Sequence, residues 1–427
     1  MRARLTGTLL VMVALGVSAC GSPSNGPAQT NKGPTDKQLI IGMINPFSGI
    51  NAAYGLDMNA GCLSAVNIIN AKGGVLGHTF KCIPIDSKGD AADAVPAVTR
   101  ALAQYSNMVG VIGPGTDAAT ATMPLLEQAQ IPTIGANGDV SFDQNAYKYY
   151  WRITPSDAAN AIAIVVAAHN LHYVKAALVF GNDAPAQTSV PVMQSAWPKA
   201  GGQIVANVSL TPSQPSYQTE AAKVAASNPD VIFTETDPQT AATFFGELKQ
   251  MGHLVPIFGT DPTIVPAWYT AVSGAMGKQN LQTYYRGVAQ YVPPSGVAVT
   301  TFNNSLLAET GVVNPGQYSF DPFTKSYYDS VNMLVLAMLK AGTVNPPDYN
   351  ASIGAVTTGS TIVNDFADGA QALAQGKSIA YSGAVGAISF DKYHNSTGNF
   401  AVVSFSPDGN PSNPLTVVTA EQLKPFA

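Results

Sequence analysis

The first part of the chain alternates short apolar runs with longer segments whose apolar residues recur at helical spacing. The apolar runs have the length and β-branched content of buried strands, and they occupy residues 38–44, 78–86, 108–113 and 131–136. The segments between them predict helices at residues 53–70, 91–105 and 119–129. Strands and helices that alternate in this way are typical of a parallel sheet with helices on both faces.

The stretch VNIINAKGGVLG at residues 66–77 indicates how the first helix ends. Its apolar residues continue the helical pattern, and Gly73 and Gly74 supply the positive φ that ends a helix. Gly77 turns the chain again before the next apolar run. The stretch is therefore predicted to be a joint between a helix and a strand.

A second unit with the same rhythm begins after YYWRITPSD at residues 149–157. Its predicted strands occupy residues 173–181, 203–210, 230–236 and 255–261. Its predicted helices lie at residues 162–171, 189–202, 217–227 and 239–252. Two similar blocks in one chain predict two lobes.

The last part of the chain is less regular. It contains a possible strand that crosses between the units and one long helix, at residues 283–292 and 325–342. Two short strands are predicted at residues 384–391 and 399–405, joined by the turn KYHNSTG. A tail shared by both blocks predicts that several crossings connect the lobes.

The N-terminus has the pattern of an export signal. MRAR is basic, and the apolar stretch LTGTLLVMVALGV is too short to span a bilayer comfortably. The small residues before Cys20 resemble a lipobox, where a bacterial lipoprotein signal is cut and its cysteine is diacylated. A plain secretory signal with a chance cysteine is the alternative. Residues 21–37 are rich in Gly, Pro, Ser and Asn, which predicts a flexible tether to a globular body outside the cytoplasm.

Two other cysteines, Cys62 and Cys82, remain in the exported chain. An even pair in an exported protein favours a disulfide. The two residues belong to the first predicted helix and the second predicted strand, which pack together in an α/β unit. Closing such a loop would contribute about 3 kcal/mol in the chain-entropy model. Two buried free thiols are the alternative.

Composition narrows the class of function. The 427 residues are 46% hydrophobic, which is enough for a large core, and the net charge of −5 comes without a basic run. Such a chain is not expected to bind nucleic acid. Among the histidines, His169 and His172 lack a third ligand at metal-binding spacing. The P-loop, G-x-S-x-G and G-x-G-x-x-G motifs are missing from the sequence, so we expect neither an enzyme nor a cofactor.

Eight short motifs follow one another in a particular order: IIGMINPFSGINAAYG, AVNIINAKGGVLG, PIDSKGD, GVIGP, IPTIGA, YWRITPSDA, a GTD turn and AISFDKYHNSTG. Their order and spacing, over about residues 38–405, resemble the type I periplasmic binding proteins, specifically the leucine/isoleucine/valine-binding branch of ABC-importer receptors. The resemblance is specific to this family and names no ligand. Some members have a disulfide between the first helix and the second strand, which supports the pairing of Cys62 with Cys82.

The resemblance implies an α/β fold of two Rossmann-like lobes with parallel-sheet cores, joined by three crossover segments. The implied organisation is a signal peptide at 1–20, a tether at 21–37, an N-terminal lobe of 38–155 with 290–390, and a C-terminal lobe of 156–289 with 391–427. It also implies a lipid-anchored receptor that closes on a small polar solute, such as an amino acid, and delivers it to an ABC permease. A ligand sensor of the same fold, which signals to a membrane partner, is the alternative.

Ligands in open α/β sheets bind beyond the carboxyl ends of the strands, where helix N-termini offer free N–H groups. Loops at such positions supply the expected ligand-binding residues: Ser48, Tyr54, Thr116, Asp117, Ala136, Asn137, Asp139, Thr236 and Asp261. Tyr54 matches an aromatic position that lines the family's cleft, with plain packing as its alternative. Arg152 is expected to have a structural role at the crossing.

Several positions depart from the pattern of amino-acid-binding members. Asp117 stands where such members have a serine that holds the ligand carboxylate, and an ionised aspartate would repel that group. Asp117 is therefore either a helix N-cap or a sign that the ligand is not a simple α-amino acid. Asn137 and Asp139 favour a polar or cationic ligand group, or a well-satisfied turn. Asp261 matches an acidic residue that pairs with the ligand amine, with a helix cap as the alternative.

Overall fold

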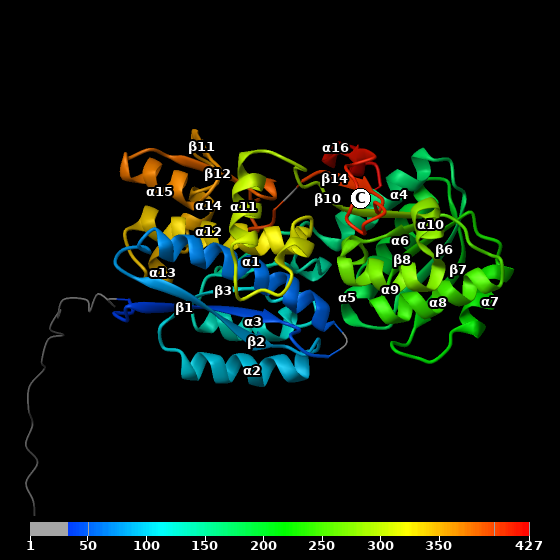
Figure 1. The fold of residues 1–427 in the computed structure, drawn as a ribbon, viewed down its shortest axis with the longest axis horizontal. Helices are drawn as coiled ribbons and strands as arrows, with labels where there is room; N and C mark the ends of the chain where they lie inside the picture. Colours follow the sequence, from blue (N-terminus) through cyan, green and yellow to red (C-terminus); the bar gives the residue numbers. More distant parts are fainter. Residues whose placement is uncertain (1–32, 50, 397, 427) are drawn as a thin grey trace, which may run out of the picture. The chain divides into compact units, whose positions relative to one another are not determined.

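The computed structural model describes residues 33–49, 51–396 and 398–426 (Figure 1). The predicted signal peptide and lipidation site, Cys20, lie outside the described residues, as does most of the predicted tether. Among the described residues, no helix combines the length and the apolar character needed to cross a membrane.

Five parallel strands form the first sheet, in the order β2-β1-β3-β4-β5. The elements of this part are β1 (Gln38–Asn45), α1 (Ala52–Ala71), β2 (Thr79–Asp86), α2 (Ala91–Gln104), β3 (Met108–Ile112), α3 (Ala119–Gln128), β4 (Thr133–Gly135), the 3-10 helix η1 (Val140–Phe142) and β5 (Tyr150–Arg152). The alternation predicted from the sequence is confirmed. The stretch at 149–157, expected only as a boundary, supplies the fifth strand.

Alternation along β1 explains how helices cover both faces of this sheet. Leu39 and Ile41 point to the side where α1 packs, and they share a core with it. Ile40 and Ile44 point to the other side and share a core with α2 and α3. Successive side chains of a strand face opposite ways, so an apolar run of this kind is buried on both faces.

The second sheet has seven strands in the order β15-β14-β10-β9-β8-β6-β7. The five neighbouring strands β10, β9, β8, β6 and β7 run parallel to one another. At one edge of the sheet, β14 is antiparallel to β10 and β15 is antiparallel to β14. Its elements are α4 (Asp157–Asn170), β6 (Lys175–Gly181), α5 (Ala184–Gln187), α6 (Ser189–Lys199), β7 (Gln203–Leu210), α7 (Gln218–Ala226), β8 (Val231–Glu235), α8 (Pro238–Gln250), β9 (Ile257–Gly259), η2 (Asp261–Ile264), α9 (Pro266–Met276), α10 (Lys278–Tyr284), β10 (Tyr285–Gln290), β14 (Phe400–Val403), β15 (Thr416–Val418) and α16 (Ala420–Leu423).

The segment between β10 and β14 returns to the first sheet. It contains α11 (Val297–Leu307), η3 (Pro315–Tyr318), α12 (Pro322–Ala341), α13 (Pro346–Tyr349), α14 (Ser352–Ala355), β11 (Thr361–Val363), α15 (Phe366–Ala374), β12 (Ile379–Gly383) and β13 (Gly386–Ala387). The core of α12 is continuous with that of β1 and α1. The chain therefore passes from one sheet's layers to the other's after β5, after β10 and before β14, which confirms two lobes with parallel-sheet cores.

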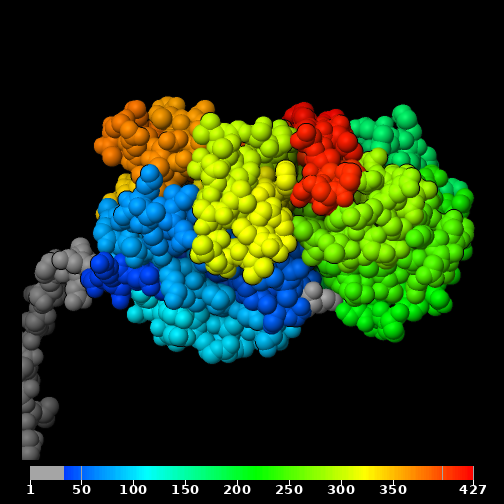
Figure 2. Space-filling model, viewed as in Figure 1, coloured from blue at the N-terminus to red at the C-terminus, as the bar shows by residue number. Residues whose placement is uncertain are grey.

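Residues distant in sequence meet in the first lobe. Figure 2 shows the yellow segment near residues 300–330 beside the blue segment that carries α1. The Ser305 hydroxyl donates to the carbonyl oxygen of Ser64 at 2.7 Å. Gly61 lets α1 approach α12 closely, because a Cβ there would lie 2.2 Å from the carbonyl oxygen of Thr324. This packing brings the start of α1 beside the start of α12.

Of the two strands predicted last, the second is confirmed and the first is wrong over most of its length. Only Gly386–Ala387 of the segment 384–391 is a strand, and it pairs with β12 in a small third sheet. The segment 399–405 supplies β14, which pairs with β10 and β15. The reason is a buried carboxylate of α12: Asp329 accepts the backbone N–H groups of Ala384 and Val385 at 3.0 and 2.7 Å, which holds this segment in the first lobe.

The joint predicted at residues 66–77 is confirmed. Gly73 and Gly74 have φ values of 96° and 76°, and the Gly74 N–H donates to the carbonyl oxygen of Ile69 at 2.9 Å. A Cβ on Gly74 would lie 1.9 Å from the carbonyl oxygen of His78, so the turn requires glycine. The helix end thereby delivers the chain into β2.

The structure contains the disulfide between Cys62 and Cys82, with a Cα–Cα distance of 6.3 Å. Both cysteines lie in the core that α1 shares with the first sheet. The bridge fastens α1, which carries Tyr54, to the edge strand β2.

Replacing both Cys62 and Cys82 by serine should lower the free energy of unfolding by about 3 kcal/mol, because the bridge restricts the unfolded chain across a separation of 20 residues. Urea unfolding under non-reducing conditions measures the change. Cys20→Ser leaves the bridge intact and is the control. Equal stability of the double variant and the wild type would contradict this account of the bridge.

Candidate functional site

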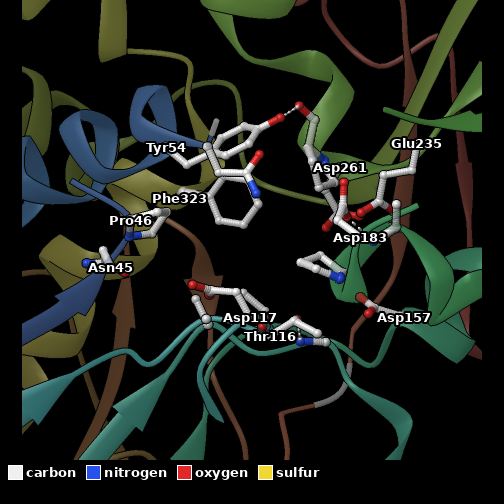
Figure 3. A pocket seen from close by; sticks show the side chains of 18 of the residues that line it. Asn45, Pro46, Tyr54, Thr116, Asp117, Asp157, Asp183, Glu235, Asp261 and Phe323 are labelled. Carbon is white, nitrogen blue, oxygen red and sulfur yellow. Dashed lines mark hydrogen bonds between the residues drawn. The ribbon is translucent and has the colours of Figure 1, made fainter. Parts of the chain in front are cut away.

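A cavity lies at the carboxyl ends of the strands of both sheets (Figure 3). Its volume is about 890 Å³ when the space open to solvent is counted. Residues that follow β1, β3, β4 and β5 line it from the first lobe, and residues that follow β6, β8 and β9 line it from the second. This is the place where parallel α/β sheets hold ligands.

Aromatic and apolar side chains form the wall on the first-lobe side. Tyr54 and Phe323 come from the starts of α1 and α12, with ring centroids 6.5 Å apart in an edge-to-face arrangement. Met58 and Pro46 continue this wall. In Figure 3 the two rings face across the cavity towards the acidic side chains of the second lobe. Tyr54, which the sequence places at the cleft, lines this cavity.

The second lobe contributes an acidic wall. Five carboxyl groups line the cavity from this side: Asp157, Asp183, Glu235, Asp237 and Asp261. Asp117 adds a sixth from the first lobe. No Lys, Arg or His side chain among the described residues lines the cavity. The site is therefore rich in negative groups that no cationic side chain of its lining balances.

Local capping chemistry explains why acidic residues stand at these positions. Asp237 is the N-cap of α8, and its Oδ1 accepts the N–H groups of Gln239 and Thr240 at 3.1 and 3.0 Å. Asp183 is the N-cap of α5 and accepts the N–H of Ala186 at 3.0 Å. Aspartate is favoured at N-caps because it satisfies free N–H groups beside the positive end of the helix.

Asp117 is held differently. Its Oδ2 accepts a hydrogen bond of 2.7 Å from the Ser87 hydroxyl. The N-cap of α3 is Ala118, so the alternative in which Asp117 is the N-cap does not hold. The Asp261 alternative fails in the same way, because Asp261 is the first residue of η2 and Thr260 precedes it at the cap.

The carboxyl groups of the cavity are easier to protonate than ordinary ones. Burial raises the pKa of Asp157 to about 6 and that of Asp261 to about 7, and the charge of Asp157 adds to the shift at Asp261. Burial and then the charge of Asp157 raise the pKa of Glu235 well above its usual value, although Glu235 accepts a hydrogen bond from Thr260. Burial also raises the pKa of Asp117 and Asp183. Buried carboxylates without a partner cation are costly, which is the physical cause.

Four polar atoms of the lining have no hydrogen-bond partner. They are Nδ2 of Asn45, the hydroxyls of Thr154 and Thr236, and Oδ2 of Asp237. The residues are 0%, 8%, 2% and 4% exposed, respectively. Buried polar groups are normally paired, so four unpaired ones in a single cavity indicate sites that a ligand completes.

The expected ligand-binding residues fall into two groups. Those that line the cavity are Tyr54, Thr116, Asp117, Ala136, Thr236 and Asp261. Those that do not are Ser48, Asn137 and Asp139. The Ser48 hydroxyl donates to Asp86 at 2.6 Å. Asn137 accepts the N–H of Asp139 at 2.8 Å, and Asp139 accepts the N–H of Ser141 at 2.8 Å, so both side chains stabilise their own turn.

Sequence reasoning missed several lining residues. They are Asn45, Asp157, Asp183, Glu235 and Phe323. Asp237 is a further residue that lines the cavity. The available signal was an acidic residue directly after, or at the end of, an apolar strand run, as in VFGND and VIFTETD. Arg152 has the structural role expected of it, because its guanidinium donates to Asp143 Oδ1 at 2.5 Å and to the Asp139 carbonyl oxygen at 3.1 Å.

One hydrogen bond joins the two walls of the cavity. The Tyr54 hydroxyl donates to the carbonyl oxygen of Pro262 at 3.2 Å. Tyr54 belongs to α1 of the first lobe, and Pro262 belongs to η2 of the second. In the part of the chain that the structure describes, no group of three or more His, Cys, Asp and Glu residues could hold a metal ion.

A sequence profile described as periplasmic binding protein matches residues 38–411. The chain belongs to the periplasmic binding protein family. An amino acid binding protein of Pseudomonas aeruginosa is 20% identical over 311 residues, which cover 72% of this chain and 80% of that protein. These matches support the type I, branched-chain amino acid branch, and the family implies an extracytoplasmic location.

Solved structures share the fold. A branched-chain amino acid transporter substrate-binding protein of Streptococcus pneumoniae, solved with isoleucine, has a TM-score of 0.72 at 20% identity and covers 90% of this chain and 99% of its own. A solute-binding protein of an ABC transporter from R. palustris, solved with benzoate, has a TM-score of 0.72 at 18% identity and covers 90% and 97%. Because these similar proteins are binding proteins, the prediction that this periplasmic binding protein is not an enzyme is confirmed.

The acidic wall should make the ligand-free protein less stable as pH rises. An aspartate of the unfolded chain has a pKa of about 4. In the folded protein, burial raises the pKa of Asp157 to about 6 and that of Asp261 to about 7. The stabilising effect of keeping them protonated is complete below about pH 4 and is lost as pH rises through these higher values.

The free energy of unfolding of the wild type should therefore fall between about pH 4.5 and pH 7.5. In the Asp261→Asn variant this fall should be smaller, by on the order of 1 kcal/mol, because one of the buried carboxyl groups is gone. Urea unfolding of both proteins at the two pH values measures the difference. Asp365→Asn, at the N-cap of α15, removes a charge outside the cavity lining and is the matched control. Parallel pH profiles for Asp261→Asn and the wild type would contradict the assignment.

Proposed function

We propose that this periplasmic binding protein is an extracytoplasmic lipoprotein of an ABC importer, which captures a small polar solute between its lobes and delivers it to a permease. The observation that carries the proposal is the cavity at which the carboxyl ends of both sheets meet, lined by residues of both lobes. A site divided between two lobes assembles when the lobes close, so ligand binding stabilises the closed form.

The ligand contacts proposed from the sequence are Tyr54, Thr116, Asp117, Ala136, Thr236 and Asp261, which share the cavity. Similar proteins support a small solute, since the structures named above hold isoleucine in one case and benzoate in the other. We place the lobe boundaries near residues 155, 290 and 390, and this proposal is supported by the changes of sheet after β5, after β10 and before β14. In this proposal the permease supplies the passage for the solute through the membrane, and its ATPase supplies the energy for transport.

Attachment to the membrane is the second part of the proposal. It rests on the sequence before the described residues, where small residues precede Cys20. Diacylation of Cys20 would hold the protein at the membrane, because each buried methylene contributes about 0.8 kcal/mol. Residues 21–37 would then give the lobes the reach to find a permease. Loss of labelling by a fatty acid probe in a Cys20→Ser variant tests the anchor.

Closure is tested with a panel of amino acids, amides, polyamines and aromatic acids. Binding raises the melting temperature by mass action, so a thermal-shift assay identifies a compound that binds. Small-angle X-ray scattering with and without this compound at saturation should then show a smaller radius of gyration in its presence. Unchanged dimensions at saturation would count against hinge closure.

Tyr54→Phe should weaken binding of that compound by about fivefold, because it removes one hydrogen bond between the lobes, worth about 1 kcal/mol, and keeps the ring. Isothermal titration calorimetry measures the affinity. Tyr269→Phe is the matched control: its hydroxyl also donates to a proline carbonyl, that of Pro407, at the same 3.2 Å, but outside the cavity lining. Equal affinities of the two variants would remove Tyr54 from the closure mechanism.

A further inference from the structure

The cavity has a charge pattern that restricts its ligand. Six carboxyl groups line it, and no Lys, Arg or His of the described residues does. The charge of Arg152 acts on Asp157, but its guanidinium donates to Asp143 and to the Asp139 carbonyl oxygen, so it is engaged outside the lining. A ligand with a negative group would add charge of the same sign to this site.

The helix N-termini at the cavity offer no substitute for a cationic side chain. A helix N-terminus can hold an anion through its free N–H groups. Here α8 has its N–H groups engaged by Asp237, and α4 has Asp157 in its first turn. Asp117 stands directly before the N-cap of α3. Each of these three helices therefore has a carboxyl group of the protein in or beside its first turn, where it would repel a ligand carboxylate.

Among the unpaired polar atoms of the lining, Oδ2 of Asp237 calls for a hydrogen-bond donor on the ligand, whereas Nδ2 of Asn45 is itself a donor. Asp237 uses one carboxylate oxygen for its helix cap, while the other has no partner although the side chain is 4% exposed. The hydroxyl of Thr236 is also unpaired, at 2% exposure. A carboxylate oxygen can only accept, so the group that completes it must donate.

The number of acidic groups favours more than one positive group on the ligand. One ammonium has three N–H donors, fewer than the six carboxyl groups around the cavity. Asp117 lies on the first-lobe side, and the other five lie on the second-lobe side. A chain with a cation at each end could contact both sides at once, with its methylene groups against Tyr54 and Phe323. These rings also suit a cation through their faces.

We propose, on the basis of the function proposed above, that the ligand is an organic polycation without an acid group, of the aliphatic diamine or polyamine class. The acidic wall of the second lobe holds one amino group, Asp117 receives the other end, and the aromatic wall covers the chain between them. Binding neutralises carboxyl groups on both lobes and so favours closure.

Calorimetry on the purified protein tests the proposal with 1,4-diaminobutane and spermidine, against leucine, benzoate, acetamide and magnesium chloride. At least one of the two amines should bind about 100-fold more tightly than any of the other compounds, and raising the salt concentration should weaken that binding. Binding of leucine, benzoate or acetamide, with no heat from either amine up to about 10 mM, would overturn this inference and leave the proposed function standing.

Two other outcomes are equally decisive. Binding of magnesium in preference to both amines would replace the organic polycation by a metal ion. If no compound of the panel binds and scattering shows no closure with any of them, the inference and the proposed function both fail.

Asp237→Asn and Asp183→Asn should each weaken binding of the better amine by about 30-fold. Asparagine still caps a helix, so the change is mainly one of charge. Asp365→Asn, at the N-cap of α15 outside the cavity lining, should change the affinity less than about twofold. Circular dichroism checks the fold, and Asp183→Asn serves if Asp237→Asn does not fold. Wild-type affinity in the folded variants would overturn the proposal.

Discussion

Parallel pairing of the strands is the constraint on which the rest of this periplasmic binding protein depends. When neighbouring strands run in the same direction, their carboxyl ends lie at one edge of the sheet, and the loops that follow them are brought together. In the first lobe this edge gathers the loops after β1, β3, β4 and β5, and in the second lobe those after β6, β8 and β9. The cavity follows from this arrangement before any ligand chemistry is considered.

The side chains at that edge of the sheets include an unusual number of acidic groups. Helices that follow strands begin at the same edge, and aspartate is a good residue with which to begin a helix. Asp183 and Asp237 satisfy this local need, but each also places a carboxyl group in a space shared with Glu235 and Asp261. Burial is the main cause of the raised pKa values of Asp157 and Asp261, and the charge of Asp157 adds to the shift at Asp261. In the proposed function the capping residues also contact the ligand, and a positive group on the ligand would offset the cost of burying them.

The two walls of the cavity differ in the way they are supported. Tyr54 and Phe323 are held by α1 and α12, which pack closely at Gly61 and are fastened to the sheet by the disulfide and a common core. The acidic wall stands on short loops and helix starts of the second lobe. The Tyr54 hydroxyl reaches across to Pro262, so the aromatic wall is also the part of the first lobe that contacts the second. The proposed ligand contact and the observed lobe contact thus involve the same residue.

The sequence by itself determined the elements and the fold class. Apolar periodicity identified β1 to β4 and β6 to β9 with their helices, Gly73 and Gly74 marked a turn, and Cys62 and Cys82 indicated the bridge, because all of these signals are local or lie within one βα unit. Tertiary structure alone decided which polar residues share a cavity. Glu235 and Asp157 are distant in sequence and look like ordinary strand-end and helix-start residues, while Ser48 and Asn137 lie in the expected loops but turn to other partners. The direction of a side chain at the end of a strand depends on contacts with segments far away in the sequence. The contact of Asp329 with residues 384–385 is of the same kind, and no local pattern records such contacts.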